Sequence, residues 1–91
     1  MHKDEDDDRF EAAARLAEAD PARGAEALRS IVADREIDPD TRFEAAARLA
    51  EADEPQAAEA LRSIVADRAF GPDIRSEAAA RLAEADPARM S

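Results

Sequence analysis

The 91-residue chain contains no cysteine, tryptophan or tyrosine, and a single histidine. Without cysteine, neither a disulfide nor a thiolate metal site can form, so the redox compartment stays open. No apolar run is long enough to cross a membrane or to form the core of a signal peptide, so we expect no membrane partner and take the cytoplasm as the default location. The missing aromatic stacking residues and the net charge of −10, which repels phosphate, predict no nucleic-acid partner.

Large apolar side chains are also scarce. Leu, Ile, Val and Phe together make up 14 residues, a share that in a highly charged chain usually accompanies disorder. Alanine compensates for this scarcity, because it adds 25 residues of the best helix-forming type and lets helices approach closely. The internal repeat of the chain outweighs its bulk composition and predicts a folded, helical protein.

The repeated stretch is RFEAAARLAEAD, which occurs at residues 9–20 and 42–53 and returns at 75–86 with Ser76 in place of phenylalanine. The offset is 33 residues, and the first two copies agree at 25 of 33 positions. A fixed period of this size is typical of stacked helical repeats. We therefore predict about two and a half copies in one helical domain, residues 9–91, divided into 9–41, 42–74 and the partial copy 75–91.

Each copy has two helical patterns separated by a proline turn. In the first helix of the first copy, apolar residues recur at helical spacing from Phe10 onward, with Leu16 widening the apolar side. Asp20-Pro21 ends this helix and begins an amphipathic second helix, because the residue before a proline avoids the α region and proline suits the first helical position. We predict an all-α fold of five helices in antiparallel pairs, with Ile37 and Phe70 turned inward from the connections.

The first eight residues hold five of the 23 acidic residues of the chain. Their mutual repulsion predicts a disordered acidic leader over residues 1–8. The run Asp4–Asp8 lacks the glycine turn and ligand spacing of a calcium loop, and His2 has no second ligand beside it. We therefore expect no metal site.

No catalytic or cofactor-binding residue is expected. Glu11, Arg15 and Glu18 have the spacing of ordinary exposed ion pairs on a helix, as do their counterparts in the later copies. The chain has no glycine-rich phosphate loop and no nucleophile beside a base. These features predict a protein that is not an enzyme, with no cofactor and no small-molecule substrate.

The polar faces of the two second helices form a candidate protein-binding face, because the same residue types recur there one period apart. A solvated face that was simply copied with the repeat is an equally good interpretation. The candidate residues are Arg23, Glu26, Arg29, Ser30, Gln56, Glu59, Arg62 and Ser63.

The unit DPDTRFEAAARLAEAD at residues 38–53, followed by Ala58 and Leu61, resembles the short HEAT-like repeats of bacterial α-solenoids. The resemblance rests on the Asp-Pro start, the arginine four residues after that aspartate, the alanine pair, the leucine and the Asp-Pro turn. It implies a right-handed α-solenoid whose second helices line a concave binding side. The period is shorter than in typical eukaryotic HEAT units, and the frequent Leu-Gly of the first helix reads Leu-Ala here.

Tetratricopeptide repeats are the alternative family, since their period is close to this one, but their tryptophan, tyrosine and Leu-Gly positions are absent. Such arrays also resemble the sensor regions of some bacterial signalling NTPases, which implies a place in a longer protein.

Two functions fit these observations. One is a non-enzymatic scaffold that presents a surface to another protein. The other is a structural or designed repeat module that only stacks or self-associates. Ser76 resembles the polar substitution of a terminal repeat, whereas the N-terminal copy keeps Phe10. We therefore expect an apolar outer side on the first copy, where another copy of the chain or further repeats would pack.

Overall fold

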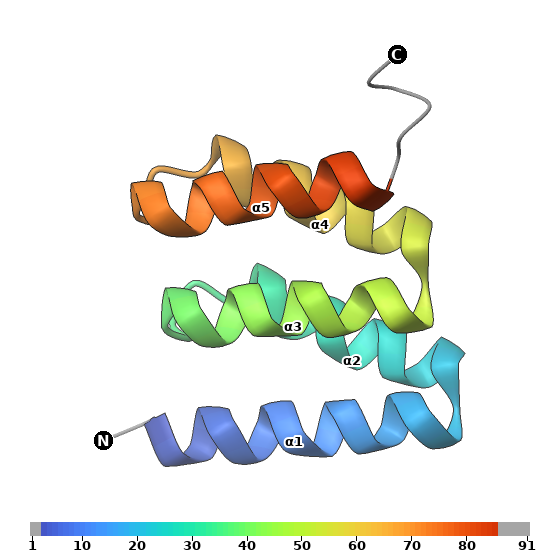
Figure 1. Ribbon diagram of the computed structural model, residues 1–91. Coiled ribbons are helices and arrows are strands. Elements are labelled where there is room, and N and C mark those ends of the chain that lie inside the picture. The colour runs from blue at the N-terminus through green and yellow to red at the C-terminus, as the bar shows by residue number, and fades with distance from the viewer. Residues whose placement is uncertain (1–2, 86–91) are drawn as a thin grey trace.

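The computed structural model describes residues 3–85, which form five α-helices and no strand. The helices are α1 (Lys3–Ala19), α2 (Pro21–Ala33), α3 (Pro39–Ala52), α4 (Glu54–Ala66) and α5 (Pro72–Ala85). Figure 1 shows α1, α3 and α5 in one layer, with α2 and α4 behind them. Successive helices contact each other, and contacts also join α1 to α3, α3 to α5 and α2 to α4. The predicted all-α fold is confirmed for the described residues.

Aspartate begins three of the helices. Asp20, Asp38 and Asp53 have extended backbone angles, and each side chain accepts a hydrogen bond from the backbone N–H three residues further on, at 3.4, 3.3 and 3.2 Å. Proline follows at the first or second helical position, where its missing N–H has no helical partner to lose. The Asp-Pro turns therefore separate the helices where the sequence predicts.

The start of α1 differs from the expectation. This helix begins at Lys3, so the prediction of a disordered leader over residues 1–8 was wrong from residue 3 onward. The physical reason is that carboxylates in the first turns of a helix interact favourably with its positive N-terminal end, and the acidic run Asp4–Asp8 occupies those turns. Met1 and His2 lie outside the described residues, as do residues 86–91 of the third copy.

The hydrophobic core lies between the two layers of helices. Ile37 and Phe70, which come from the connections after α2 and α4, are both buried as predicted. Burial of one such side chain contributes about 1.5–3 kcal/mol. The largest fully buried side chains are Phe70, Leu28, Ile31, Leu49, Leu61 and Ile64.

Equivalent alanines of α1, α3 and α5 report which sides of these helices are covered. Ala45 of α3 and Ala78 of α5 are fully buried, whereas Ala12, at the same position of α1, is exposed. At the next position, about 100° further round the helix, Ala46 of α3 is fully buried and its α5 counterpart Ala79 is exposed. Helix α3 therefore packs on both sides, while α1 and α5 each have one side covered.

The exposed side of α1 includes apolar residues, but not Phe10, on which the expectation rested, because Phe10 packs partly buried against the core. Leu16 is 38% exposed, while its counterpart Leu49 in α3 is fully buried. Ala12 and Ala19, on the same helix, are also exposed. Leu16 and Leu49 lie in identical stretches of sequence, which predicts the same burial for both. Their burial differs because Leu16 has no helix of the described residues on its outer side.

Helices α1 and α2 approach each other closely at Gly24. A Cβ added there would lie 2.1 Å from the Cα of Ala17, closer than two such atoms can come. The equivalent position of α4 is Ala57, which is fully buried. The α3–α4 pair therefore accommodates a methyl group where the α1–α2 pair does not.

Candidate protein-binding groove

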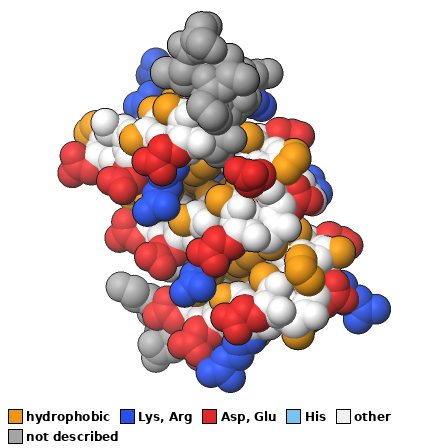
Figure 2. Space-filling view, turned by 45° about the vertical axis from the view of Figure 1, so that its right-hand side comes forward, with side chains coloured by type: hydrophobic (Ala, Val, Ile, Leu, Met, Phe, Trp, Pro, Cys, Tyr) orange, Lys and Arg blue, Asp and Glu red, His pale blue; other side chains and the backbone are white. Residues whose placement is uncertain are grey.

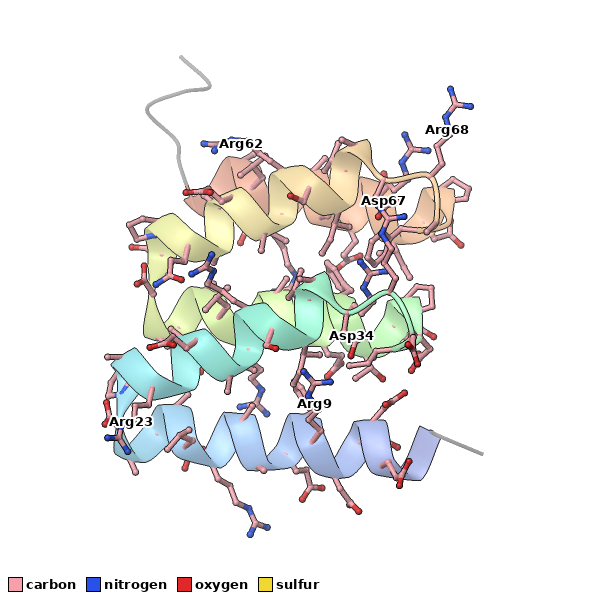
Figure 3. The ribbon with its side chains drawn as sticks, turned by 180° about the vertical axis from the view of Figure 1, so that it is seen from behind. Arg9, Arg23, Asp34, Arg62, Asp67 and Arg68 are labelled. Carbon is pink, nitrogen blue, oxygen red and sulfur yellow. The ribbon has the colours of Figure 1, made fainter. Side chains whose placement is uncertain are left out.

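A groove with a volume of about 630 Å³ lies between α2 and α4. Figure 3 shows these two helices from the side opposite to Figure 1, with both in front of α1, α3 and α5. The floor is apolar and comes from Val32 and Ala33 of α2, Ala60 and Ile64 of α4, and the Phe70 ring. The walls are polar and come from the same two helices and the connections after them.

Six of the eight predicted face residues line this groove. Both helices begin at an N-cap aspartate, Asp20 for α2 and Asp53 for α4, and their polar faces meet at the groove. The residues that meet there are Glu26, Arg29 and Ser30 from α2, and Gln56, Glu59 and Ser63 from α4.

The other two predicted residues lie elsewhere. Arg23 lies at the turn between α1 and α2, where its Nε is 3.8 Å from an oxygen of the N-cap Asp20. Arg62 points away from α2 (Figure 3) and is not part of the lining. Arg62 is the counterpart of Arg29, and this position faces α4 in the first copy, whereas no further second helix of the described residues lies on that side in the second copy.

The groove has balanced charge. Glu26, Glu59 and Asp67 supply three carboxylates, and three guanidinium groups come from Arg29, Arg35 and Arg42. The molecule as a whole is strongly acidic, and Figure 2 shows carboxylates spread over the face that it presents, with arginines between them. The groove is therefore suited to a partner with mixed polar and apolar groups and not to a strongly charged one.

Gln56 is held by the cap of α4. Its backbone N–H and its side-chain Nε2 both donate to the carboxylate of Asp53, at 3.2 and 2.6 Å. The side-chain Oε1 is buried and accepts no hydrogen bond from the described residues. Gln56 thus shapes the wall of the groove mainly through its bonds to Asp53.

The most buried charged residue of the groove is Arg42, which the sequence analysis did not include in the candidate face. Its Nε donates to the backbone carbonyl of Val32 at 2.9 Å, and its guanidinium carbon lies 4.6 Å from the centre of the Phe70 ring. Its Nη2 lies 3.9 Å from a carboxylate oxygen of Asp67. Arg42 therefore ties the end of α2 to the connection after α4, at the base of the groove.

The arginines equivalent to Arg42 make only part of these contacts. Arg9 pairs with Asp34 at 2.8 Å and donates to Ser30 Oγ at 3.0 Å. Arg75 donates from Nε to the carbonyl of Val65 at 3.0 Å. Recurrence of arginine at this position in all three copies was the signal in the sequence, but its role depends on helices that lie on both sides.

The same arginines set the charge state of Asp34. The backbone N–H of Glu36 donates to its carboxylate at 3.0 Å, and this bond lowers the pKa of Asp34. The hydrogen bond and charge of Arg9 and the charge of Arg42 lower it further, while desolvation opposes them. Asp34 thus keeps its negative charge at a pH where an ordinary aspartate begins to take up a proton.

None of the His, Asp and Glu side chains of the described residues gather in a group of three or more that could hold a metal ion. Two of the predicted exposed ion pairs are present, Glu11 with Arg15 at 3.7 Å and Glu77 with Arg81 at 4.0 Å. No helix in this part of the chain has the length and apolar character needed to span a bilayer.

Comparison of the chain with protein-family models, with curated proteins and with solved structures gives no match.

Proposed function

We propose that the protein is a non-enzymatic helical-repeat scaffold that binds a segment of another protein in the groove between α2 and α4. It is a right-handed α-solenoid of about two and a half 33-residue repeats, with α2 and α4 on the concave side. The resemblance to HEAT-like repeats supports this architecture, and so do the contacts that link α1 to α3, α3 to α5 and α2 to α4.

The observation that carries the proposal is the convergence of two equivalent polar rows on one groove with an apolar floor. Protein interfaces combine an apolar centre with a polar rim in this way. The volume, about 630 Å³, is similar to that of pockets that hold small molecules, about 300–1,000 Å³. The groove has no enclosing loop, however, and lies open along two parallel helices, which suits an extended or helical peptide segment.

A peptide-display library panned against the purified protein tests this proposal. Enriched peptides are synthesised, and their affinities are measured by fluorescence anisotropy against the wild type and two variants. Arg29→Glu reverses a charge in the groove and should weaken binding about tenfold, or 1.4 kcal/mol. Arg62→Glu makes the same change at the equivalent position outside the groove and should leave the affinity unchanged.

The two variants make the outcome decisive. A failure to enrich any peptide over an unrelated helical protein contradicts the proposal. Peptides that bind Arg29→Glu as well as they bind Arg62→Glu contradict it too, because they would bind a different surface.

Self-association is a second candidate, and the exposed outer side of α1 favours it. Leu16, Ala12 and Ala19 form an apolar surface there. Size-exclusion chromatography with light scattering over a range of concentrations tests this function. A dimer that Leu16→Glu converts to a monomer supports it, whereas a wild type that is monomeric at every concentration excludes it.

A further inference from the structure

Five charged residues of alternating sign follow one another from α1 to α5, close to where α2 and α4 end: Arg9, Asp34, Arg42, Asp67 and Arg75. We refer to them as the arginine–aspartate ladder. Arg9 and Asp34 are paired at 2.8 Å, and Arg42 and Asp67 are 3.9 Å apart. The charge of Arg42 also acts on Asp34. The ladder therefore begins and ends with an arginine.

Arg75 is the member of the ladder with an incomplete set of contacts. In the two earlier copies, the guanidinium reaches the aspartate 25 residues further on, which ends the following helix. Arg75 makes the bond to the preceding carbonyl, at Val65, but no carboxylate of the described residues lies within 4.0 Å of it. Arg75 therefore has no counterpart of the Arg9–Asp34 and Arg42–Asp67 pairs among the described residues.

The surface around Arg75 is less buried than the equivalent surfaces of α2 and α3. Val65 and Leu82 are only partly buried, although Val32 and Leu49 at the same positions are buried. Ala79 is exposed, although Ala46 is fully buried. We refer to the surface formed by Val65, Arg75, Ala79 and Leu82 as the α4–α5 end face.

We propose that the α4–α5 end face binds an amphipathic helix of another protein that has the apolar pattern of α4 and an aspartate at its C-terminal end, paired with Arg75. Two interfaces within the molecule supply the template. Helix α2 packs on α1 with Asp34 against Arg9, and α4 packs on α3 with Asp67 against Arg42. The charge of Arg75 complements the aspartate that this pattern carries, and Val65, Ala79 and Leu82 match its apolar side.

A labelled synthetic peptide of residues 53–69, which spans α4 and its two caps, is the probe. Its anisotropy is followed as the unlabelled full chain is added, and we expect saturable one-to-one binding. Ala79→Glu places a charge on the α4–α5 end face and should abolish this binding. Ala22→Glu is the matched control, because it changes an exposed alanine of α2 that lies outside the α4–α5 end face and outside the groove.

A double-mutant cycle tests the predicted ion pair. Arg75→Gln in the protein and Asp67→Asn in the peptide should each weaken binding about fivefold to tenfold, and the two changes together should add little more. Additive effects would mean that these two groups do not meet, which contradicts the proposal.

Three further outcomes overturn the proposal, and each is distinguishable from failure of the groove. The first is no saturable binding of the peptide. The second is binding that Arg29→Glu weakens and Ala79→Glu does not, which would place the peptide in the groove between α2 and α4. The third is a dimer of the protein, present without peptide and dissociated by Ala79→Glu, which would make a second copy the occupant of the α4–α5 end face.

Discussion

Replacement of Arg42 by alanine should destabilise the protein more than any other change to an arginine of the described residues. The side chain of Arg42 is only 7% exposed, and it makes a hydrogen bond, an aromatic contact and an ion pair at once. All three partners belong to other parts of the chain: Val32, Phe70 and Asp67. The variant therefore removes an attachment between helices and leaves the helical propensity of α3 almost unchanged, since alanine is the best helix former.

The magnitude follows from the separate contacts. A hydrogen bond from a charged donor contributes about 1.5–3 kcal/mol. A cation stacked on an aromatic ring adds about 0.5–2 kcal/mol, and the ion pair with partly exposed Asp67 at most about 1 kcal/mol. Because these terms share one side chain and are not additive, we expect a loss of about 3–4 kcal/mol. A domain of this size has a free energy of unfolding of about 5–14 kcal/mol, so the loss is a large part of the total.

Urea unfolding followed by far-ultraviolet circular dichroism measures this loss. The matched control is Arg9→Ala, at the equivalent position, because the side chains of Arg9 and Asp34 are 43% and 33% exposed. An ion pair with that exposure contributes about 1 kcal/mol or less. Arg42→Lys keeps the charge but not the planar fork, so it should lose about half as much as Arg42→Ala. If Arg42→Ala is unfolded without denaturant, its stability is measured in an osmolyte that favours the folded state.

The result that would refute this reasoning is an Arg42→Ala variant whose free energy of unfolding falls by no more than that of Arg9→Ala. Burial and the contacts with three other segments would then contribute nothing beyond a surface ion pair. Such a result would also contradict the idea that the arginine–aspartate ladder holds the helices together.

Three further changes have expected outcomes that the same unfolding assay checks. Gly24→Ala should destabilise by about 1–3 kcal/mol, because the new Cβ meets Ala17, although helix propensity alone predicts a gain of about 1 kcal/mol; a gain would contradict the close approach of α1 and α2. Asp34→Asn should be less stable than the wild type at pH 7. The difference in free energy of unfolding should disappear as the pH falls below the ordinary aspartate pKa of 3.8 and through the lowered pKa of Asp34, because protonation removes the same charge from the wild type. A difference that persists in acid would contradict this. Gly71→Asp should stabilise the protein by about 0.5–1 kcal/mol, because Gly71 precedes α5 as Asp38 precedes α3 and an aspartate there can cap the helix. No atom lies within 4 Å of a Cβ added at Gly71, so the new side chain has room. A loss of stability would show that α5 begins differently from α3.

The helix boundaries between Asp20 and Ala66 were predictable from the sequence, because they depend on local chemistry. An aspartate that caps a helix and a proline in the first turn act within a few residues of each other. The inward direction of Ile37 and Phe70 was predictable for a similar reason, since each interrupts a polar connection. The start of α1 was not, because repulsion among its carboxylates and their attraction to the helix N-terminus oppose each other, and composition does not decide between them.

The candidate groove was only partly predictable. The amphipathic pattern of one helix places Arg29 and Arg62 at the same position, but only Arg29 faces a neighbouring second helix among the described residues. The role of Arg42 was missed for a related reason: the residues it contacts are 10, 25 and 28 positions away and lie outside α3, where the pattern of a single helix gives no information.

The three equivalent arginines differ in the number of helices that each of them joins. Arg9 contacts the helix that follows, Arg75 the helix that precedes, and Arg42 both. The number of contacts that each arginine makes thus depends on how many helices lie beside it. The burial of the equivalent alanines depends on neighbouring helices too, since Ala12 is exposed whereas Ala45 and Ala78 are fully buried. Such a molecule has its strongest contacts around α3 and incomplete interfaces at α1 and at the α4–α5 end face. A helix that packs on the α4–α5 end face would meet a surface that is already formed, which is what the proposal for that face requires.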